Sequence, residues 1–300
     1  MSTKVGIWID HRKAIVVAIT KHPLLFFFLL SYAISWSIWS PLLLAKQGMI
    51  SDRPPQYLHL LGSLGPALAA LIMTRICSGS VGLRDLWRRM FEWRVAPRWY
   101  AIACLPFLLF FVAILFTGWN NWEPQSFGRS AEYPELPALL YGIISILFYG
   151  WGEETGWRGF ALPRLQTHQS ALKATVILSL GWALWHLPLF SFMPGFSRMG
   201  VAGILGWYLS GLTGAIILTW LTNSTRGSIL IAAIFHGTMD IVFVSPASAS
   251  VTNILGAAIM VWGIAVLFIA KPKYLSAMGK VVMGQAEDAD KVVVQGQRNY

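Results

Sequence analysis

Residues 252–270 read Thr-Asn-Ile-Leu-Gly-Ala-Ala-Ile-Met-Val-Trp-Gly-Ile-Ala-Val-Leu-Phe-Ile-Ala and contain no charged side chain. A helix needs about 20 predominantly apolar residues to cross a hydrocarbon layer of about 30 Å. Apolar runs of this length without period-2 alternation indicate helices, which satisfy their own backbone groups in lipid. This stretch therefore predicts a transmembrane helix.

The composition of the whole chain agrees with a membrane protein. Charged residues make up only 12% of the 300 residues, whereas a typical soluble domain has roughly 25%. Apolar residues make up 56% and the mean hydropathy is +0.58. Too few charges remain to cover a soluble surface, and this hydrophobicity excludes a disordered chain. The net charge of +10 is explained by membrane topology, so we expect no nucleic-acid partner.

Seven further apolar stretches follow the same pattern, so we predict an all-α, polytopic membrane protein of about eight transmembrane helices. Residues 1–22 form a short cytoplasmic appendage, residues 23–270 form the membrane domain, and residues 271–300 form a polar cytoplasmic tail. Within the appendage, two β-rich runs around a polar turn favour a hairpin over residues 5–17. The predicted spans are Pro23–Ala45, Tyr57–Cys77, Trp99–Gly118, Pro137–Trp151, Ala171–Phe190, Gly203–Thr222, Ser228–Val244 and Thr252–Ala270.

The positions of the basic residues support an even number of spans. With a cytoplasmic N-terminus, all but four of the 23 Lys and Arg residues fall in segments on the cytoplasmic side. Lys and Arg are enriched in cytoplasmic loops of membrane proteins. Both termini are therefore predicted to be cytoplasmic, in a protein of the plasma (inner) membrane. The four exceptions are Lys46, Arg53, Arg129 and Arg198.

Few ionisable residues fall in or beside these spans, and each costs about 2.5–3.5 kcal/mol at the centre of a membrane helix. Glu153 and Glu154 end the fourth span, His186 lies in the fifth, and His236 and Asp240 lie in the seventh. Carboxylates and imidazoles are the groups that activate water. We therefore expect an active site inside the bundle, formed by these residues. The other histidines, near span ends or in loops, are expected to be solvated; they are His11, His22, His59 and His168.

The spacing of these residues suggests how they divide their roles. Glu154 and Arg158 are four residues apart, so they share a helix face and can form an ion pair. Glu153 lies about 100° around the same helix, which leaves it free for chemistry. His236 and Asp240 are also four residues apart and lie side by side on one helix.

Three segments resemble the motifs of the CPBP family, the CAAX-processing endopeptidases and bacteriocin-processing or abortive-infection proteins. Glu153-Glu-Thr-Gly-Trp-Arg158 is similar to the EExxxR motif, and Trp182-Ala-Leu-Trp-His186 is similar to FxxxH, with Trp in place of Phe. His236-Gly-Thr-Met-Asp240 is similar to HxxxN or HxxxD. The resemblance covers residues 137–245 firmly, and the eight-span plan loosely.

The resemblance implies an intramembrane endopeptidase that hydrolyses a membrane-anchored protein or peptide, including the CAAX type that gives the family its name. Glu153 with His186 would activate a water molecule. His236 and Asp240 would stabilise the tetrahedral intermediate, and Glu154 with Arg158 would support the site.

Several alternatives remain open at this stage. Two histidines and a carboxylate also suit zinc, so His186, His236, Asp240 and Glu153 could hold that metal. Asp240 stands where prenyl-processing members often carry Asn, so it is either protonated or acts as a base or metal ligand. Intramembrane Glu, His and Asp also form the relays of proton-coupled transporters. An inactive member acting as a scaffold or immunity protein is the third possibility.

Overall fold

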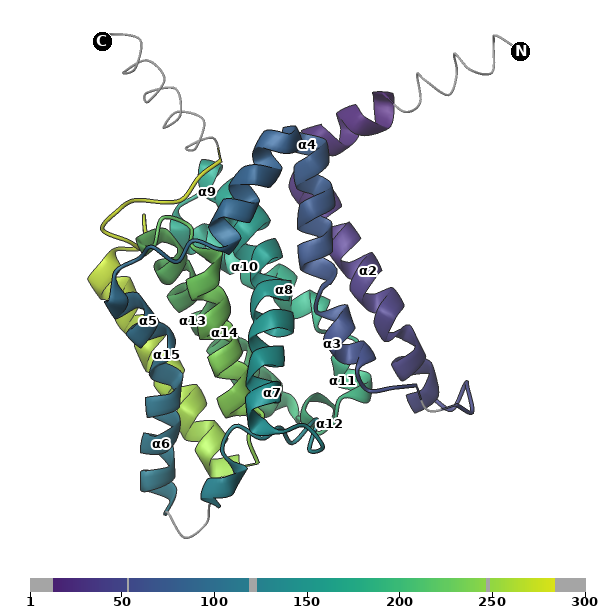
Figure 1. The fold of residues 1–300 in the computed structure, drawn as a ribbon, viewed down its shortest axis with the longest axis vertical. Coiled ribbons are helices and arrows are strands. Elements are labelled where there is room, and N and C mark those ends of the chain that lie inside the picture. The colour runs from purple at the N-terminus through teal and green to yellow at the C-terminus, as the bar shows by residue number, and fades with distance from the viewer. Residues whose placement is uncertain (1–12, 53, 119–122, 247–248, 284–300) are drawn as a thin grey trace.

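The computed structural model of the protein describes residues 13–52, 54–118, 123–246 and 249–283. Within these ranges every regular element is helical and none is a strand, so the predicted all-α class is confirmed. Figure 1 shows most of the long helices running roughly along the long axis of a single bundle.

The helices follow one another with short connections, and π-helical turns interrupt the central one. The first six helices are α2 (Pro23–Lys46), α3 (Leu58–Gly62), α4 (Gly65–Met90), α5 (Pro97–Ala103), α6 (Leu105–Thr117) and η2 (Pro124–Ser126). The central run is α7 (Ala138–Ile144), η3 (Ser145–Trp151), α8 (Gly152–Gly156), η4 (Trp157–Ala161) and α9 (Leu162–His168). The remaining helices are α10 (Ala171–Trp185), α11 (Leu189–Phe192), α12 (Pro194–Ser197), α13 (Val201–Ser224), α14 (Ile229–Phe243) and α15 (Ala249–Ala270).

Each of the eight predicted spans coincides with helix, but the helices differ in length. Among the described residues, α2, the α3–α4 run, α13 and α15 are long and apolar enough to cross a membrane, and the pair α5 and α6, bent by 40°, adds a fifth crossing. The other three predicted spans correspond to the 15-residue helices α10 and α14 and to the central run. A polytopic helical protein is thus confirmed, and the number eight stays a prediction.

The two ends of the bundle differ in charge. At the upper end of Figure 1 lie the start of α2, the far end of α4, α9, the start of α10 and the end of α15. Hydrogen bonds join these segments, from Ser228 Oγ to the Glu92 carbonyl and from Asn223 Nδ2 to the Tyr274 carbonyl. Several basic residues that were predicted to be cytoplasmic lie in these segments or directly beside them, namely Lys21, Arg164, Lys173 and Lys271.

The appendage differs from its prediction where the structure describes it, and the tail begins packed against the bundle. Residues 13–21 are helical, so the predicted hairpin is wrong for residues 13–17, and its remainder lies outside the described residues. The first part of the tail, residues 271–283, is held against the bundle. Lys280 Nζ donates to the carbonyls of Gln166 and Gln169 at 2.7 and 2.9 Å.

Glycines allow α14 to lie directly against the central run. A Cβ atom on Gly150 would lie 2.4 Å from the Ala233 carbonyl oxygen, and one on Gly237 would lie 2.9 Å from the Ile146 Cα. These contacts involve backbone atoms, which cannot move away by changing a side-chain rotamer. The close approach positions the motif residues of the two elements next to one another.

Gly237→Ala should therefore destabilise the protein by about 1–3 kcal/mol, because the added methyl group overpacks this contact. Unfolding by titration with a denaturing detergent would measure the loss. Gly206→Ala on α13 is the matched control, since nothing lies within 4 Å of its added Cβ. Equal stability of the two variants would contradict this account of the contact.

Candidate active site

The segment that carries both glutamates is a short α-helix between two π-helical turns. Helix α8 holds Glu153 and Glu154, with η3 before it and η4 after it. π-Helical turns widen a helix locally and often occur at functional sites. A Cβ on Gly156 would lie 2.7 Å from the Pro66 backbone, so glycine is needed for α8 to pack this closely against α4.

Glu154 forms the predicted ion pair with Arg158, and both side chains are buried. The Arg158 Nη1 atom lies 2.9 Å from each carboxylate oxygen of Glu154. Glu154 is 0% exposed and Arg158 is 4% exposed. Removing one member of such a pair would leave an unpaired charge inside the protein.

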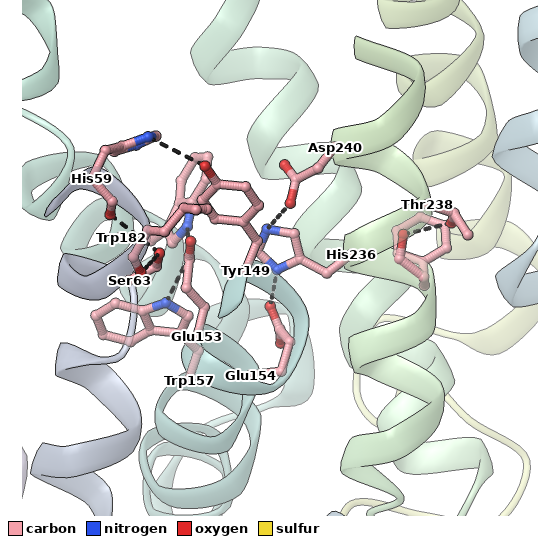
Figure 2. A network of polar contacts seen from close by, with 12 residues as sticks. His59, Ser63, Tyr149, Glu153, Glu154, Trp157, Trp182, His236, Thr238 and Asp240 are labelled. Carbon is pink, nitrogen blue, oxygen red and sulfur yellow. Dashed lines mark hydrogen bonds and ion pairs between the residues drawn. The ribbon is translucent and has the colours of Figure 1, made fainter. Parts of the chain in front are cut away.

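Glu154 also contacts His236 on α14, which local spacing did not predict. The Nδ1 atom of His236 lies 2.7 Å from Glu154 Oε1. An ionised carboxylate only accepts hydrogen bonds, so Nδ1 carries the proton and Nε2 faces away from Glu154. Figure 2 shows this imidazole between Glu154 and Asp240. Its Nε2 atom lies 3.9 Å from Asp240 Oδ2, which is too long for a direct hydrogen bond.

Glu153 takes no part in this ion pair, and its carboxylate accepts hydrogen bonds from two tryptophans. The indole N–H groups of Trp182 and Trp157 donate to its Oε2 atom at 2.9 and 3.2 Å. In Figure 2 the two glutamates leave the same helix in different directions, Glu153 toward these indoles and Glu154 toward His236. The two indoles fix the orientation of the Glu153 carboxylate.

His186 is connected to Glu153 through Trp182. Its Nδ1 atom lies 2.8 Å from the Trp182 carbonyl oxygen, and its ring lies 4.0 Å from the Trp182 ring, centroid to centroid. A carbonyl oxygen only accepts, so Nδ1 carries the proton and a neutral His186 presents a basic Nε2. The aromatic residue predicted one turn before this histidine therefore links the two candidate groups.

The described residues do not gather the proposed zinc ligands into one metal centre. None of them forms a group of three or more His, Cys, Asp or Glu side chains placed to share an ion. Glu153 Oε2 is engaged by indoles, and the Nδ1 atoms of His186 and His236 are bonded to protein oxygens. A histidine that binds zinc through Nε2 also donates from Nδ1 to a protein oxygen, so zinc at these residues stays a prediction, and we derive no step through a metal.

His59 was expected to be solvated, and this expectation is wrong. Its side chain on α3 is buried, and its Nδ1 atom lies 3.1 Å from Tyr133 Oη and 3.2 Å from Tyr149 Oη. Tyr149 stands one turn before Glu153 on the central run, so the cluster adjoins the site. The signal available in the sequence was the position of His59 inside the second predicted span, where an imidazole is costly.

Glu132 belongs to the same cluster from the loop between η2 and α7. Its Oε2 atom lies 3.9 Å from His59 Nδ1. Burial raises the pKa of the Glu132 carboxyl to about 7. The carboxyl beside the buried histidine therefore changes its protonation state near neutral pH.

Comparisons with known proteins agree with the motifs. Residues 134–242 match the family model described as type II CAAX prenyl endopeptidase Rce1-like. The match covers 109 of the 300 residues of the chain. A protein named CAAX prenyl protease 2 from Methanococcus maripaludis is 34% identical over 113 residues, which are 36% of this chain and 40% of that relative. The matched segment of the Rce1-like model contains the central run, α10 and nearly all of α14, and so all three motifs.

Proposed function

We propose that this protein is an intramembrane endopeptidase that hydrolyses a peptide bond of a membrane-anchored protein or peptide. The observation that carries the proposal is the convergence of two separate acid–base units on α8. One unit joins Glu153 through Trp182 to His186, and the other joins Glu154 to His236. The Rce1-like match over the segment that holds both units supports the same reaction class.

Glu153 acts as the general base in this proposal. Its hydrogen bonds all use Oε2, so Oε1 is the oxygen assigned to the attacking water. The carboxylate takes one proton as the water oxygen bonds to the scissile carbonyl carbon. Nε2 of His186 provides a second acceptor for the water. The proton then passes to the departing amine nitrogen as the C–N bond breaks.

His236 and Asp240 act on the carbonyl oxygen of the substrate. The Nδ1 atom of His236 is held by Glu154, and Glu154 is held by Arg158. This chain fixes the imidazole so that Nε2 faces Asp240. Oδ2 of Asp240 is buried and makes no hydrogen bond within the described part of the chain. Either group, when protonated, can donate to the oxyanion of the tetrahedral intermediate.

The substrate class in this proposal is taken from the name of the similar protein. The curated relative is named a CAAX prenyl protease, so a prenylated cysteine near the C-terminus of the substrate is the first chemistry to test. The chain spans only 40% of that relative, and the substrate is therefore part of the proposal. We further propose that the basic end of the bundle faces the cytoplasm, at the plasma (inner) membrane.

Metal removal separates the proposed mechanism from a zinc mechanism. Purified protein in proteoliposomes would be treated with chelators until elemental analysis finds no bound metal, and then given a membrane-anchored prenylated peptide. We expect the cleavage rate to be unchanged, because the base is a carboxylate and the oxyanion donors are protein groups. Loss of cleavage that added Zn²⁺ restores would overturn the metal-free mechanism.

A further inference from the structure

The α3–α4 run is too long for all of it to lie within one membrane crossing. The α3–α4 run covers 33 residues, about 50 Å at 1.5 Å per residue, against the roughly 30 Å of a hydrocarbon layer. At Gly79 the backbone leaves the helical conformation, with φ +61° and ψ −150°. Figure 1 shows α4 bending sharply, its second half sloping over the basic end of the bundle. We call residues 80–98, which leave the direction of the first half of α4 at this bend, the surface segment.

This surface segment presents apolar and basic side chains on the same outer face. Val81, Arg84, Trp87, Arg88 and Phe91 recur at helical spacing and are all exposed, Trp87 by 62%. The opposite face, with Leu86 and Arg89, is buried against η4. An exposed face that mixes tryptophan, other apolar side chains and arginine suits the membrane interface, where aromatic rings lie at headgroup level and long basic side chains reach the headgroups.

The charge of the segment favours anionic headgroups. Asp85 is paired with both Arg88 and Arg89. The guanidinium groups of Arg84, Arg94 and Arg98 form no ion pair within 4.0 Å in the described ranges, and Glu92 accepts a hydrogen bond from the backbone N–H of Arg94 at 3.0 Å. The guanidinium groups of Arg94 and Arg98 lie 5.4 and 5.2 Å from the ring centroids of their neighbours Trp93 and Trp99.

The same segment is bonded to the central run on both sides of α8. Arg89 Nη2 donates to the Gly159 carbonyl in η4 at 2.8 Å. The Trp151 indole, just before α8, donates to the Met90 carbonyl at 2.9 Å. The ring of Phe91 also lies 5.7 Å from that of Trp151, centroid to centroid. A force on the surface segment is therefore transmitted to the helix that carries the two glutamates.

We propose that residues 80–98 bind the anionic lipid headgroups of the bilayer, and that this contact holds α8 in its active position. The first half of the statement concerns the surface alone, whereas the second rests on the proposed function. Each basic residue near an anionic membrane surface is attracted to it, and the attraction weakens with salt.

Hydrogen exchange tests the binding without any assay of activity. The full-length protein would be placed in nanodiscs of phosphatidylcholine alone or with about one-third phosphatidylglycerol, and exchange of the amides of residues 80–98 compared. We expect about tenfold slower exchange with the anionic lipid, and no slowing in the variant Arg84→Gln/Arg94→Gln/Arg98→Gln. The matched control is the variant Lys21→Gln/Lys173→Gln/Lys273→Gln, which removes three exposed charges from the same end of the bundle. Its amide exchange should equal that of the wild type. Equal exchange in the two lipids, or equal effects of both variants, would overturn the proposal.

Turnover of the prenylated peptide in the same nanodiscs tests the coupling. Wild type should cleave several-fold faster with anionic lipid, and the triple Arg variant should lose this gain. Lipid-dependent exchange with lipid-independent turnover would overturn the coupling to α8. Absence of cleavage in either lipid would count against the proposed peptidase function, while the exchange result would still decide whether the headgroups bind.

Discussion

Protein carrying Glu153→Gln should lose peptidase activity by about 10²–10⁴-fold, the range typical for removal of a general base. The amide keeps the size of the side chain and its oxygen can still accept from Trp182 and Trp157. It cannot take a proton from water, however. The loss should therefore appear in kcat, measured with a membrane-anchored prenylated peptide in proteoliposomes.

The matched control for this variant is Glu135→Gln, the same chemical change at an exposed site, where the carboxylate accepts a hydrogen bond from Tyr57 at 3.1 Å. It should keep wild-type turnover. Full activity of Glu153→Gln would overturn the assignment of the base. If neither protein cleaved the peptide but the Glu153→Gln variant restored the phenotype of cells that lack the wild-type protein, a scaffold role would be favoured. Proton flux that depends on Asp240 would favour a transporter.

Arg158→Met should destabilise the protein by about 3–5 kcal/mol, because it leaves the buried Glu154 carboxylate without its guanidinium partner. Methionine fills much of the volume of the arginine side chain, so the lost charge dominates the effect. Unfolding by detergent titration would measure the change. The double variant Glu154→Gln/Arg158→Met removes the stranded charge and should recover part of the loss.

An exposed ion pair provides the comparison. Arg88 pairs with Asp85 at 2.7 Å, but its side chain is 56% exposed. Solvent screening limits such a pair to less than about 1 kcal/mol, so Arg88→Met should be nearly neutral. Similar losses of unfolding free energy for the two variants would show that the buried Glu154–Arg158 pair stabilises the protein no more than an exposed pair does.

Local spacing predicted the parts of the site that lie on one helix. The Glu154–Arg158 pair follows from the four-residue repeat, and the structure contains it. The bond from Trp182 to Glu153 joins residues 29 apart, and the bond from His236 to Glu154 joins residues 82 apart. Such partners depend on how helices pack, which no single helix encodes. For that reason the sequence did not predict the two indole partners of Glu153.

Hydropathy located the helices but not their breaks. Every predicted span coincides with helix, because burial of apolar residues in lipid dominates their placement. The bend at Gly79 uses a positive φ of +61° that glycine allows, and the hydropathy of a stretch of residues predicts neither this bend nor the π-helical turns beside α8. His59 shows the same limit. Its burial depends on Tyr133, which is brought over it from a distant loop.

The most direct test of the central claim is to follow the oxygen of water through the cleavage. Wild-type protein would cleave the membrane-anchored prenylated peptide in water enriched in oxygen-18, with hydroxylamine present to trap any acyl-enzyme. Mass spectrometry would then measure the masses of the products. Direct attack by a Glu153-activated water predicts one heavy oxygen in the new carboxyl group and no hydroxamate. A hydroxamate product would reveal a covalent acyl-enzyme and would contradict direct attack by water. The absence of any cleavage would contradict the proposed peptidase function.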